Sequence, residues 1–289
     1  MTAIATDWED YELIDAGAKQ KLERWGSHIL VRPDPQALWQ PHDDRRWDRA
    51  EAVYHRSAKG GGQWEMRAKL PDEWTVGYHG LTFKVAPTNF KHTGLFPEQA
   101  VNWDWMTSKI AGAGRPIHVL NLFAYTGAAS MACAAAGAAE VVHVDAAKGM
   151  VGWAKENMTL CGLQDHTIRF IVDDVMKFVA RQQRRGVKYQ AIIMDPPSYG
   201  RGPNNELWKL EDQLDGLIGQ CAALLDDQPL FFLVNAYTTG FSPLVLANIM
   251  HQRLDGAFKG GRLTVEELAL PASDGPILLP CGLFGRYED

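Results

Sequence analysis

The stretch IHVLNLFAYTGAASMACAAAGAAEVVHVD (117–145) decides the fold class. Its two ends, 117–123 and 140–145, are short runs of apolar and β-branched residues, which is the pattern of strands buried on both faces of a sheet. Between them, residues 128–137 are small side chains that favour a helix, and the run ends at a glycine, a common helix terminator. A buried strand, a helix and a second buried strand predict a right-handed βαβ unit with parallel strands.

The same alternation continues toward the C-terminus. Further strands are predicted at 167–174, 190–195, 229–237, 262–270 and 277–288, and helices at 148–162, 175–186, 206–225 and 243–254. Because no helix separates the last two strands, we expect them to pair antiparallel at one edge of the sheet. The sequence therefore predicts an α/β fold with a doubly wound, seven-stranded, mostly parallel sheet.

The first third of the chain has a different texture. Six of the ten tryptophans lie before residue 90, among short runs of strand-forming residues bounded by turn residues. Those runs are HILVRP (28–33), AVYHRS (52–57), QWEMRAKLP (63–71) and LTFKVAP (81–87). Short runs of this kind predict antiparallel strands. We therefore expect a small β-rich N-terminal domain at 1–88, followed by the α/β domain at 89–289.

Composition limits the class of protein. Of the 289 residues, 46% are hydrophobic and 22% are charged, which is typical of a globular chain, and no apolar run reaches the roughly 20 residues of a membrane helix. The acidic start lacks the features of a signal peptide, so we expect a cytoplasmic protein without a membrane partner. The four cysteines are far apart and form no C-x-x-C pair, which indicates reduced thiols and no metal site.

The net charge of −6 does not by itself favour a nucleic-acid partner. Two clusters of basic residues are exceptions to this negative balance, and each is interpreted more simply as solvated surface charge than as a nucleic-acid site. They are Arg45, Arg46 and Arg49, and Arg181, Arg184, Arg185 and Lys188.

Ligands of open α/β sheets bind outside the carboxyl ends of the strands, near the point where the strand order reverses. The first such turn, NLFAYTGAAS (121–130), lacks the G-x-G-x-x-G that brings a pyrophosphate onto a helix N-terminus. Only Gly127 is present, and the bulky Phe123 and Tyr125 stand nearby. This weighs against NAD, FAD or ATP and suits S-adenosylmethionine, which carries no phosphate; the alternative is a tight turn without a ligand.

Aspartates follow the second and third strands. Asp145 is placed to accept both hydroxyls of a ribose, and Asp173 or Asp174 is placed to accept from an adenine amino group. The alternative for each is a cap on the helix that follows it, at 148 or at 175. Acids at successive strand ends support a nucleoside site more strongly than any one of them does.

The motif Asp195-Pro196-Pro197-Ser198-Tyr199 follows the fourth strand. Two prolines fix the backbone and remove two N–H donors, which leaves the Asp195 carboxylate and the Pro196 carbonyl as rigid acceptors for an incoming amino or ring N–H. Tyr199 is suited to stack on a flat substrate, as aromatic side chains do with unstacked bases. The alternative is a strand-ending turn in which Asp195 is a cap.

These motifs, in their order, resemble class I S-adenosylmethionine-dependent methyltransferases. The segments VLNLFAYTGAAS, HVDAAKGMVGWAKENMTLCGL, FIVDDVMKF and IIMDPPSYG are most similar to the branch that methylates bases of bacterial large-subunit ribosomal RNA. The segment KHTGLFPEQAVNWDWM (91–106) resembles that branch's lead-in to the first strand. The resemblance covers about residues 90–240 and implies a Rossmann-like methyltransferase domain, with ribosomal RNA as partner.

The resemblance also implies roles for individual residues. The cofactor would be bordered by Asn121, Phe123, Tyr125, Thr126, Gly127, Asp145, Ala146, Asp173, Asp174, Val175 and Asp195, and closed over by Lys91, Thr93, Phe96 and Gln99. The reacting atoms would be faced by Asp195, Pro196, Pro197 and Tyr199.

Two departures from the branch shape the functional hypothesis. Members that make 5-methylcytosine attack the ring with a cysteine that follows the fourth or fifth strand, and the motifs DPPSYG and VNAYTTGF hold none. Direct transfer to a nitrogen is therefore favoured. No RNA-binding appendage is recognisable in the N-terminal part. The alternatives are methylation of a small molecule or a protein side chain, a non-catalytic cofactor-binding module and, more distantly, a nicotinamide oxidoreductase; oligomeric state stays open.

Overall fold

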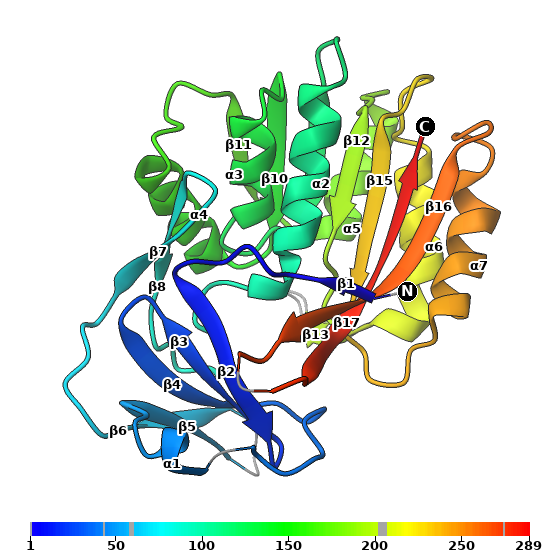
Figure 1. The fold of residues 1–289 in the computed structure, drawn as a ribbon. Helices are drawn as coiled ribbons and strands as arrows, with labels where there is room; N and C mark the ends of the chain where they lie inside the picture. The colour runs from blue at the N-terminus through cyan, green and yellow to red at the C-terminus, as the bar shows by residue number, and fades with distance from the viewer. Residues whose placement is uncertain (1, 43, 58–60, 202–206, 274) are drawn as a thin grey trace. The chain divides into compact units, whose positions relative to one another are not determined.

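The structure is a computed structural model that describes residues 2–42, 44–57, 61–201, 207–273 and 275–289. The chain forms two compact units (Figure 1). Unit 1 contains Asn102–Glu267 and Gly282–Asp289 with Thr2, and unit 2 contains Ala3–Val101 and Leu268–Cys281. The domain boundary expected between residues 88 and 89 stays a prediction.

The main sheet in the described residues has eight strands in the order β1-β16-β17-β15-β12-β9-β10-β11. These are β1 (Thr2–Ile4), β9 (His118–Leu122), β10 (Glu140–Asp145), β11 (Ile168–Val172), β12 (Ala191–Met194), β15 (Phe231–Ala236), β16 (Arg262–Pro271) and β17 (Leu278–Glu288). Strands β11, β10, β9, β12 and β15 are parallel neighbours. The predicted α/β fold with a mostly parallel sheet is confirmed, and the strand order reverses at β9, between β10 and β12.

The C-terminal edge differs in detail from the prediction. Strand β17 pairs antiparallel with β15 and so lies between β15 and β16, and the short β1 adds an eighth strand beyond β16. The insertion follows from composition, because β17 is buried along most of its length and needs a neighbour on both sides.

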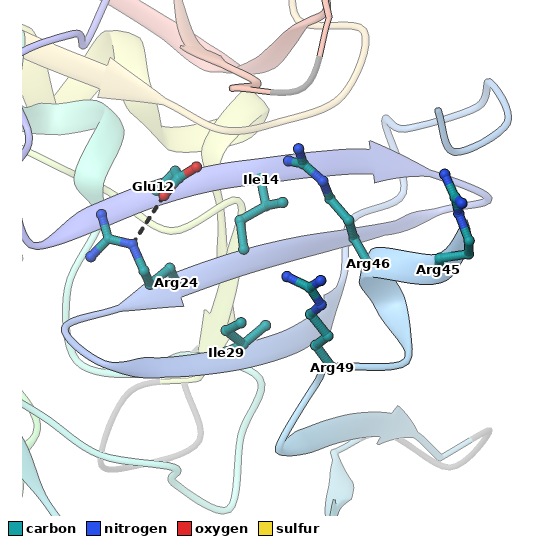
Figure 2. Close-up of a pocket in the computed structure, with 7 residues that line it drawn as sticks. All are labelled: Glu12, Ile14, Arg24, Ile29, Arg45, Arg46 and Arg49. Atoms are coloured by element: carbon teal, nitrogen blue, oxygen red, sulfur yellow. Dashed lines mark hydrogen bonds and ion pairs between the residues drawn. The ribbon is translucent and has the colours of Figure 1, made fainter. Parts of the chain in front are cut away.

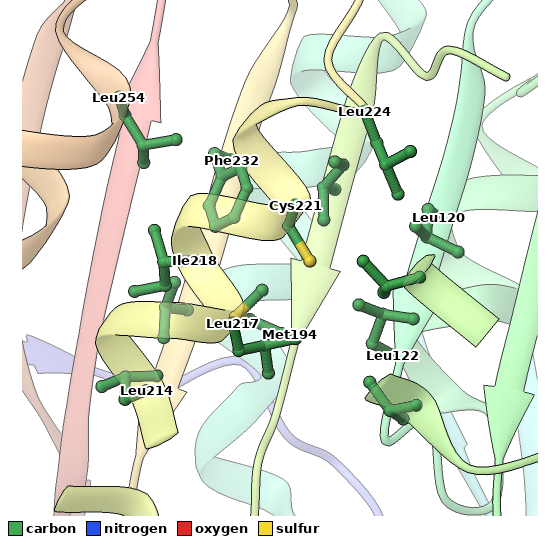
Figure 3. Close-up of a cluster of buried hydrophobic side chains, with 14 of the residues drawn as sticks. Leu120, Leu122, Met194, Leu214, Leu217, Ile218, Cys221, Leu224, Phe232 and Leu254 are labelled. Carbon is green, nitrogen blue, oxygen red and sulfur yellow. The ribbon is translucent and has the colours of Figure 1, made fainter. Parts of the chain in front are cut away.

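Helices cover both faces of this sheet, as a doubly wound fold requires. They are α2 (Ala100–Ala111), α3 (Ala128–Ala135), α4 (Lys148–Leu160), α5 (Val175–Arg184), α6 (Leu210–Ala222) and α7 (Pro243–Leu254). Successive side chains of β9 point to opposite faces of the sheet. Leu120 and Leu122 join the core formed with α5, α6 and α7 (Figure 3), whereas Asn121 between them donates to Ser130 of α3.

A short hairpin precedes α6. Strand β13 (Tyr199–Arg201) pairs antiparallel with β14 (Leu207–Lys209), so α6 begins at Leu210, and the helix predicted from 206 begins too early. Residue 206 itself lies outside the described residues.

Unit 2 is built on a five-stranded sheet in the order β2-β3-β4-β5-β6. Its strands are β2 (Tyr11–Gly17), β3 (Gln20–Trp25), β4 (His28–Pro33), β5 (Ala52–Arg56) and β6 (Gly62–Met66), and β7 (Trp74–Tyr78) and β8 (Leu81–Val85) form a separate hairpin. The predicted strands are present, but β4 and β5 are parallel rather than antiparallel. The connection between them contains the short helix α1 (Asp44–Trp47), and it must return the chain to the end of the sheet where β4 begins, so that β5 can run parallel to β4.

Candidate functional site

The carboxyl ends of β9, β10, β11 and β12 carry the residues that the sequence singles out in unit 1. The turn after β9 has a strained backbone. Phe123 and Tyr125 have left-handed φ angles of 55° and 50°, and Gly127 has a φ of 88°. A left-handed conformation costs a non-glycine residue about 1–2 kcal/mol, and such residues cluster at functional sites.

Neighbouring elements hold this turn in place. The Ala124 N–H donates to the Val144 carbonyl (3.0 Å), the Tyr125 N–H donates to Asp145 Oδ2 (2.9 Å), and the Asn157 side chain donates to the Thr126 carbonyl (2.9 Å). Strand β10 and helix α4 therefore stabilise a conformation that the turn would not adopt alone. Asn157, which the sequence reasoning missed, is fully buried for this purpose.

Replacing Gly127 with alanine is expected to lower the free energy of unfolding by about 2–3 kcal/mol. A Cβ there would lie 3.0 Å from the Ala154 Cβ and 3.3 Å from the Met131 Cε, in addition to the cost of the positive φ. The matched control is Gly137→Ala, because Gly137 has a φ of 92° but nothing within 4 Å of an added Cβ; it should cost about 1 kcal/mol. Urea unfolding measures both, and equal losses would contradict the packing argument.

Asp145 ends β10 and is partly buried. Its Oδ2 accepts from Tyr125 N–H and its Oδ1 from Ala147 N–H (2.8 Å). Burial raises the pKa of this carboxyl above its usual range, and the two N–H donors only partly oppose the shift. The N-cap of α4 is Ala147, so Asp145 lies two residues before the cap position and organises the loop ahead of it. A carboxylate at a strand end with further acceptor capacity suits two ribose hydroxyls.

A buried polar chain lies beneath the same turn. Asn121 Nδ2 donates to Ser130 Oγ (2.9 Å), and Ser130 Oγ lies 3.0 Å from His143 Nδ1. Burial lowers the pKa of His143 to about 3, which keeps the imidazole neutral, and its Nε2 is buried without a partner among the described residues. Asn121 is thus engaged within the fold, and its predicted place beside the cofactor rests on its position in β9.

The two acids after β11 have different surroundings. Asp173 forms an ion pair with Arg181 and accepts from Asp174 N–H (2.9 Å). Asp174 is the N-cap of α5, and its Oδ1 accepts from Lys177 N–H (2.9 Å), which is the capping alternative. Capping occupies one of its oxygens. Val175 buries its side chain in the core, so only its backbone can face a ligand.

The motif after β12 is held by hydrogen bonds to neighbouring elements. Asp195 N–H donates to the Leu122 carbonyl (3.2 Å), and the Pro197 carbonyl accepts from Trp208 Nε1 (2.6 Å). The Trp208 ring also lies 5.3 Å from the Phe123 ring. Trp208 of β14 therefore joins the turn after β9 to the motif after β12, a role that the sequence reasoning missed. Its one signal is a tryptophan shortly after the motif.

Within that motif, exposure separates the predicted residues. Pro196 is buried and Pro197 is exposed, while Tyr199 leaves 56% of its surface open to solvent. Because an exposed tyrosine at this edge offers an aromatic face, it remains available to a flat substrate.

A polar side chain near the end of β15 is engaged in hydrogen bonds within unit 1. Asn235 Oδ1 accepts from Asn102 Nδ2 (3.1 Å), and Asn102 Oδ1 accepts from Arg286 Nε (2.9 Å). The guanidinium of Arg286 lies over the Trp105 ring, and burial lowers its pKa to about 10. Because Asn235 is engaged in this network, we take the carboxyl ends of β9, β10, β11 and β12 as the candidate site.

The predicted lead-in residues Lys91, Thr93, Phe96 and Gln99 all belong to unit 2. The Lys91 carbonyl accepts from Arg32 Nη1 (3.0 Å), burial lowers the pKa of the Lys91 amine to about 8, and Thr93 Oγ1 is buried without a partner among the described residues. Their role toward a cofactor stays a prediction.

Arg32 is itself held by a buried ion pair. Arg32 Nε donates to Glu23 Oε2 (2.6 Å), and Arg32 Nη2 donates to Glu23 Oε1 (2.8 Å). Burial alone would raise the pKa of Glu23, but the charges of Arg32 and Lys21 outweigh it and lower the pKa to about 2.

A depressed carboxyl pKa gives a definite pH dependence. The stability that Glu23 contributes is fully present above the pKa of an unfolded glutamate, about 4.3, and is lost as the pH falls toward 2. Urea unfolding between these pH values should show this loss in the wild type and a smaller one in Glu23→Gln. The exposed Glu9→Gln is the control, and a Glu23→Gln profile that parallels the wild type would contradict the assignment.

In the described part of the chain, no three His, Cys, Asp or Glu side chains gather as a metal site, and no helix is long and apolar enough to cross a membrane.

Comparison with known proteins bears on this geometry. Residues 47–211 match the family model of S-adenosylmethionine-dependent methyltransferases. A ribosomal RNA large subunit methyltransferase K/L of Magnetococcus marinus is 31% identical over 224 residues, which is 76% of this chain and 29% of the relative. Its counterpart in Shewanella frigidimarina is 32% identical over 59% of this chain and 24% of the relative. The chain thus spans less than a third of the length of these relatives.

Solved structures agree with the fold. The SAM-dependent methyltransferase from Agrobacterium tumefaciens has a TM-score of 0.93 and 39% identity, covering 100% of this chain and 93% of that one. SMU.776, solved in complex with SAH, has a TM-score of 0.72 over 98% of this chain and 76% of that one, and at 18% identity it shows the shared fold alone.

Proposed function

The chain belongs to the S-adenosylmethionine-dependent methyltransferases, and from that premise we propose that it methylates a nitrogen of an RNA base by direct in-line transfer. The observation that carries the proposal is the rigid Asp195-Pro196 pair of acceptors beside an exposed Tyr199. The relatives named for ribosomal RNA support the choice of RNA, and an rRNA substrate implies a cytoplasmic enzyme.

The donor set fits the cofactor. Asp145 would hold the ribose hydroxyls, the turn from Phe123 to Gly127 would border the methionine part, and Asp174 Oδ2 with the Val175 backbone would face the adenine. S-adenosylmethionine supplies a methyl group that is already activated by its sulfonium. The residues of this chain therefore need to provide orientation and the exclusion of water rather than strong acid or base chemistry.

Asp195 and Pro196 would act on the other reactant. The Asp195 carboxylate and the Pro196 carbonyl accept hydrogen bonds from the N–H of the nucleophile, which aims its lone pair. As the nitrogen becomes positively charged, the carboxylate stabilises that charge. Tyr199 would stack on the base and hold its plane.

The state of the cysteines supports transfer to nitrogen rather than to C5 of cytosine. Attack on the ring requires a thiolate, but Cys133, Cys221 and Cys281 are buried, and burial raises the pKa of each thiol. Cys221 lies in the α6 core, as the sequence indicates. Cys161 is partly exposed but follows α4, away from the strand-end motifs DPPSYG and VNAYTTGF.

Two measurements test the proposal. Calorimetric titration should show binding of S-adenosylmethionine and S-adenosylhomocysteine and none of NAD. Labelled methyl groups should then appear in bacterial large-subunit rRNA, in a nucleoside methylated on nitrogen. Methylation of small amines or of protein but not of RNA would favour the alternative substrates. Cofactor binding without any product would favour a non-catalytic module, and both outcomes contradict the proposal.

A further inference from the structure

A pocket of about 550 Å³ lies on unit 2, and nothing in the proposed methyl transfer uses it. Its described lining is strongly basic. The lining residues are Glu12, Ile14, Arg24, Ile29, Arg45, Arg46 and Arg49 (Figure 2). Four guanidinium groups and one carboxylate give this lining a surplus of three positive charges, on a chain whose net charge is −6.

The floor of the pocket comes from three neighbouring strands. Glu12 of β2 lies opposite Arg24 of β3, which lies opposite Ile29 of β4, and Ile14 is on the same face of β2. Arg24 Nε donates to Glu12 Oε2 (3.0 Å), so this pair balances its own charge. The other three arginines of the lining are Arg45, Arg46 and Arg49, which Figure 2 shows extending from the α1 segment.

The α1 segment is anchored in the core of unit 2, which fixes where these arginines begin. Trp47 Nε1 donates to Asp15 Oδ2 (2.9 Å), and Trp47 packs against the buried cluster that includes Ala50. The Arg49 N–H also donates to the Arg46 carbonyl (3.1 Å). Because the backbone is ordered before any ligand arrives, less conformational entropy is lost on binding.

All the cations of the lining are arginines. A guanidinium presents a planar fork of N–H donors that matches two oxygens of a phosphate, and it is more weakly hydrated than an ammonium. An apolar floor of Ile14 and Ile29 strengthens such contacts by lowering the local dielectric. Together these features favour a ligand with anionic oxygens, such as a phosphate group, over a neutral ligand.

We propose that the Arg45–Arg46–Arg49 pocket binds the phosphodiester backbone of the RNA substrate. This inference rests on the proposed function and adds to it, because it gives an otherwise acidic chain a local surface for RNA. Backbone phosphates carry no sequence information, so the pocket would hold and orient the RNA while the strand-end motifs act on the base.

The test compares two charge-matched double variants of the full chain. Arg46→Gln/Arg49→Gln alters the pocket, and Arg184→Gln/Arg185→Gln removes the same charge at the exposed end of α5. Filter binding of bacterial large-subunit rRNA across a salt series measures the Kd and its salt slope. The pocket variant should bind about tenfold more weakly, with a slope lower by about one per arginine, and the α5 variant should stay near wild type.

Further readouts separate the possible failures. Thermal unfolding and calorimetric titration with S-adenosylmethionine should be alike in all three proteins, and a pocket variant that is misfolded is replaced by the single variant Arg49→Gln. If rRNA binding is weakened equally in both double variants, or is not weakened in the pocket variant, the proposed role of the pocket is overturned. Methylation of rRNA by the wild type would still support the proposed function. A wild type that neither binds nor methylates rRNA overturns both.

A last arm separates RNA from small phosphates. Inorganic phosphate and AMP are titrated into wild type and the pocket variant. If either binds the wild type at micromolar Kd and loses affinity in the variant, while rRNA binding is the same in both, the pocket serves a small phosphate and the RNA inference is overturned.

Discussion

Replacing Asp195 with alanine is expected to lower the kcat of methyl transfer by about 10³-fold while changing the Kd of S-adenosylmethionine far less. Asp195 follows β12, and its N–H donates to the Leu122 carbonyl, so the backbone that carries the carboxylate is positioned before the substrate arrives. The carboxylate is needed most when the attacking nitrogen acquires positive charge. Its loss therefore raises the barrier more than it weakens binding of either reactant.

The isosteric variant Asp195→Asn separates charge from shape. It keeps an acceptor oxygen at the same place but removes the negative charge, so its kcat should fall between those of wild type and Asp195→Ala. Single-turnover transfer of a labelled methyl group, with calorimetric titration of the cofactor, measures both quantities. Turnover of Asp195→Ala at the wild-type rate would remove Asp195 from the mechanism and with it the main support for the proposed function.

The sequence predicted the parallel part of the sheet because its signal is local. The parallel strands β9, β10, β11, β12 and β15 are short apolar runs, and a helix separates each from the next, so the order along the chain dictates the architecture. The strand ends could then be named in advance as the place of the site. The left-handed conformation of Phe123 and Tyr125 could not be predicted, because nothing in two aromatic residues indicates a positive φ.

The features that the sequence did not predict depend on distant partners. Strand β17 lies between β15 and β16, and β4 pairs in parallel with β5; both pairings are set by contacts between segments that are far apart along the chain. Trp208 and Asn157 were missed for the same reason. Each makes its decisive hydrogen bond to a backbone carbonyl, which leaves no residue-type signal at the accepting position.

Replacing Asp145 with alanine is expected to raise the Kd of S-adenosylmethionine by roughly 10²-fold or more, because each ribose hydroxyl would lose a charged acceptor worth about 1.5–3 kcal/mol. The Tyr125 N–H would also lose its partner, which loosens the strained turn that borders the cofactor. Asp145→Asn keeps the shape and one acceptor oxygen, so its Kd should lie between those of wild type and Asp145→Ala. Calorimetric titration measures all three.

The stability of the ligand-free protein should depend less on Asp145. Burial raises the pKa of Asp145, so what this group contributes to folding is present below the pKa of an unfolded aspartate and is lost as the pH rises through the folded value. At neutral pH its charge is therefore a cost to the empty fold, and relief of that cost offsets part of the hydrogen bonding that Asp145→Asn loses, because an amide has one acceptor oxygen for the N–H groups of Tyr125 and Ala147. The urea midpoint of Asp145→Asn should therefore lie closer to wild type than that of Asp145→Ala. A buried charge kept at that cost is explained by a ligand that donates hydrogen bonds to it. An Asp145→Asn protein that is less stable than wild type but binds the cofactor equally well would show that the carboxylate serves the turn alone.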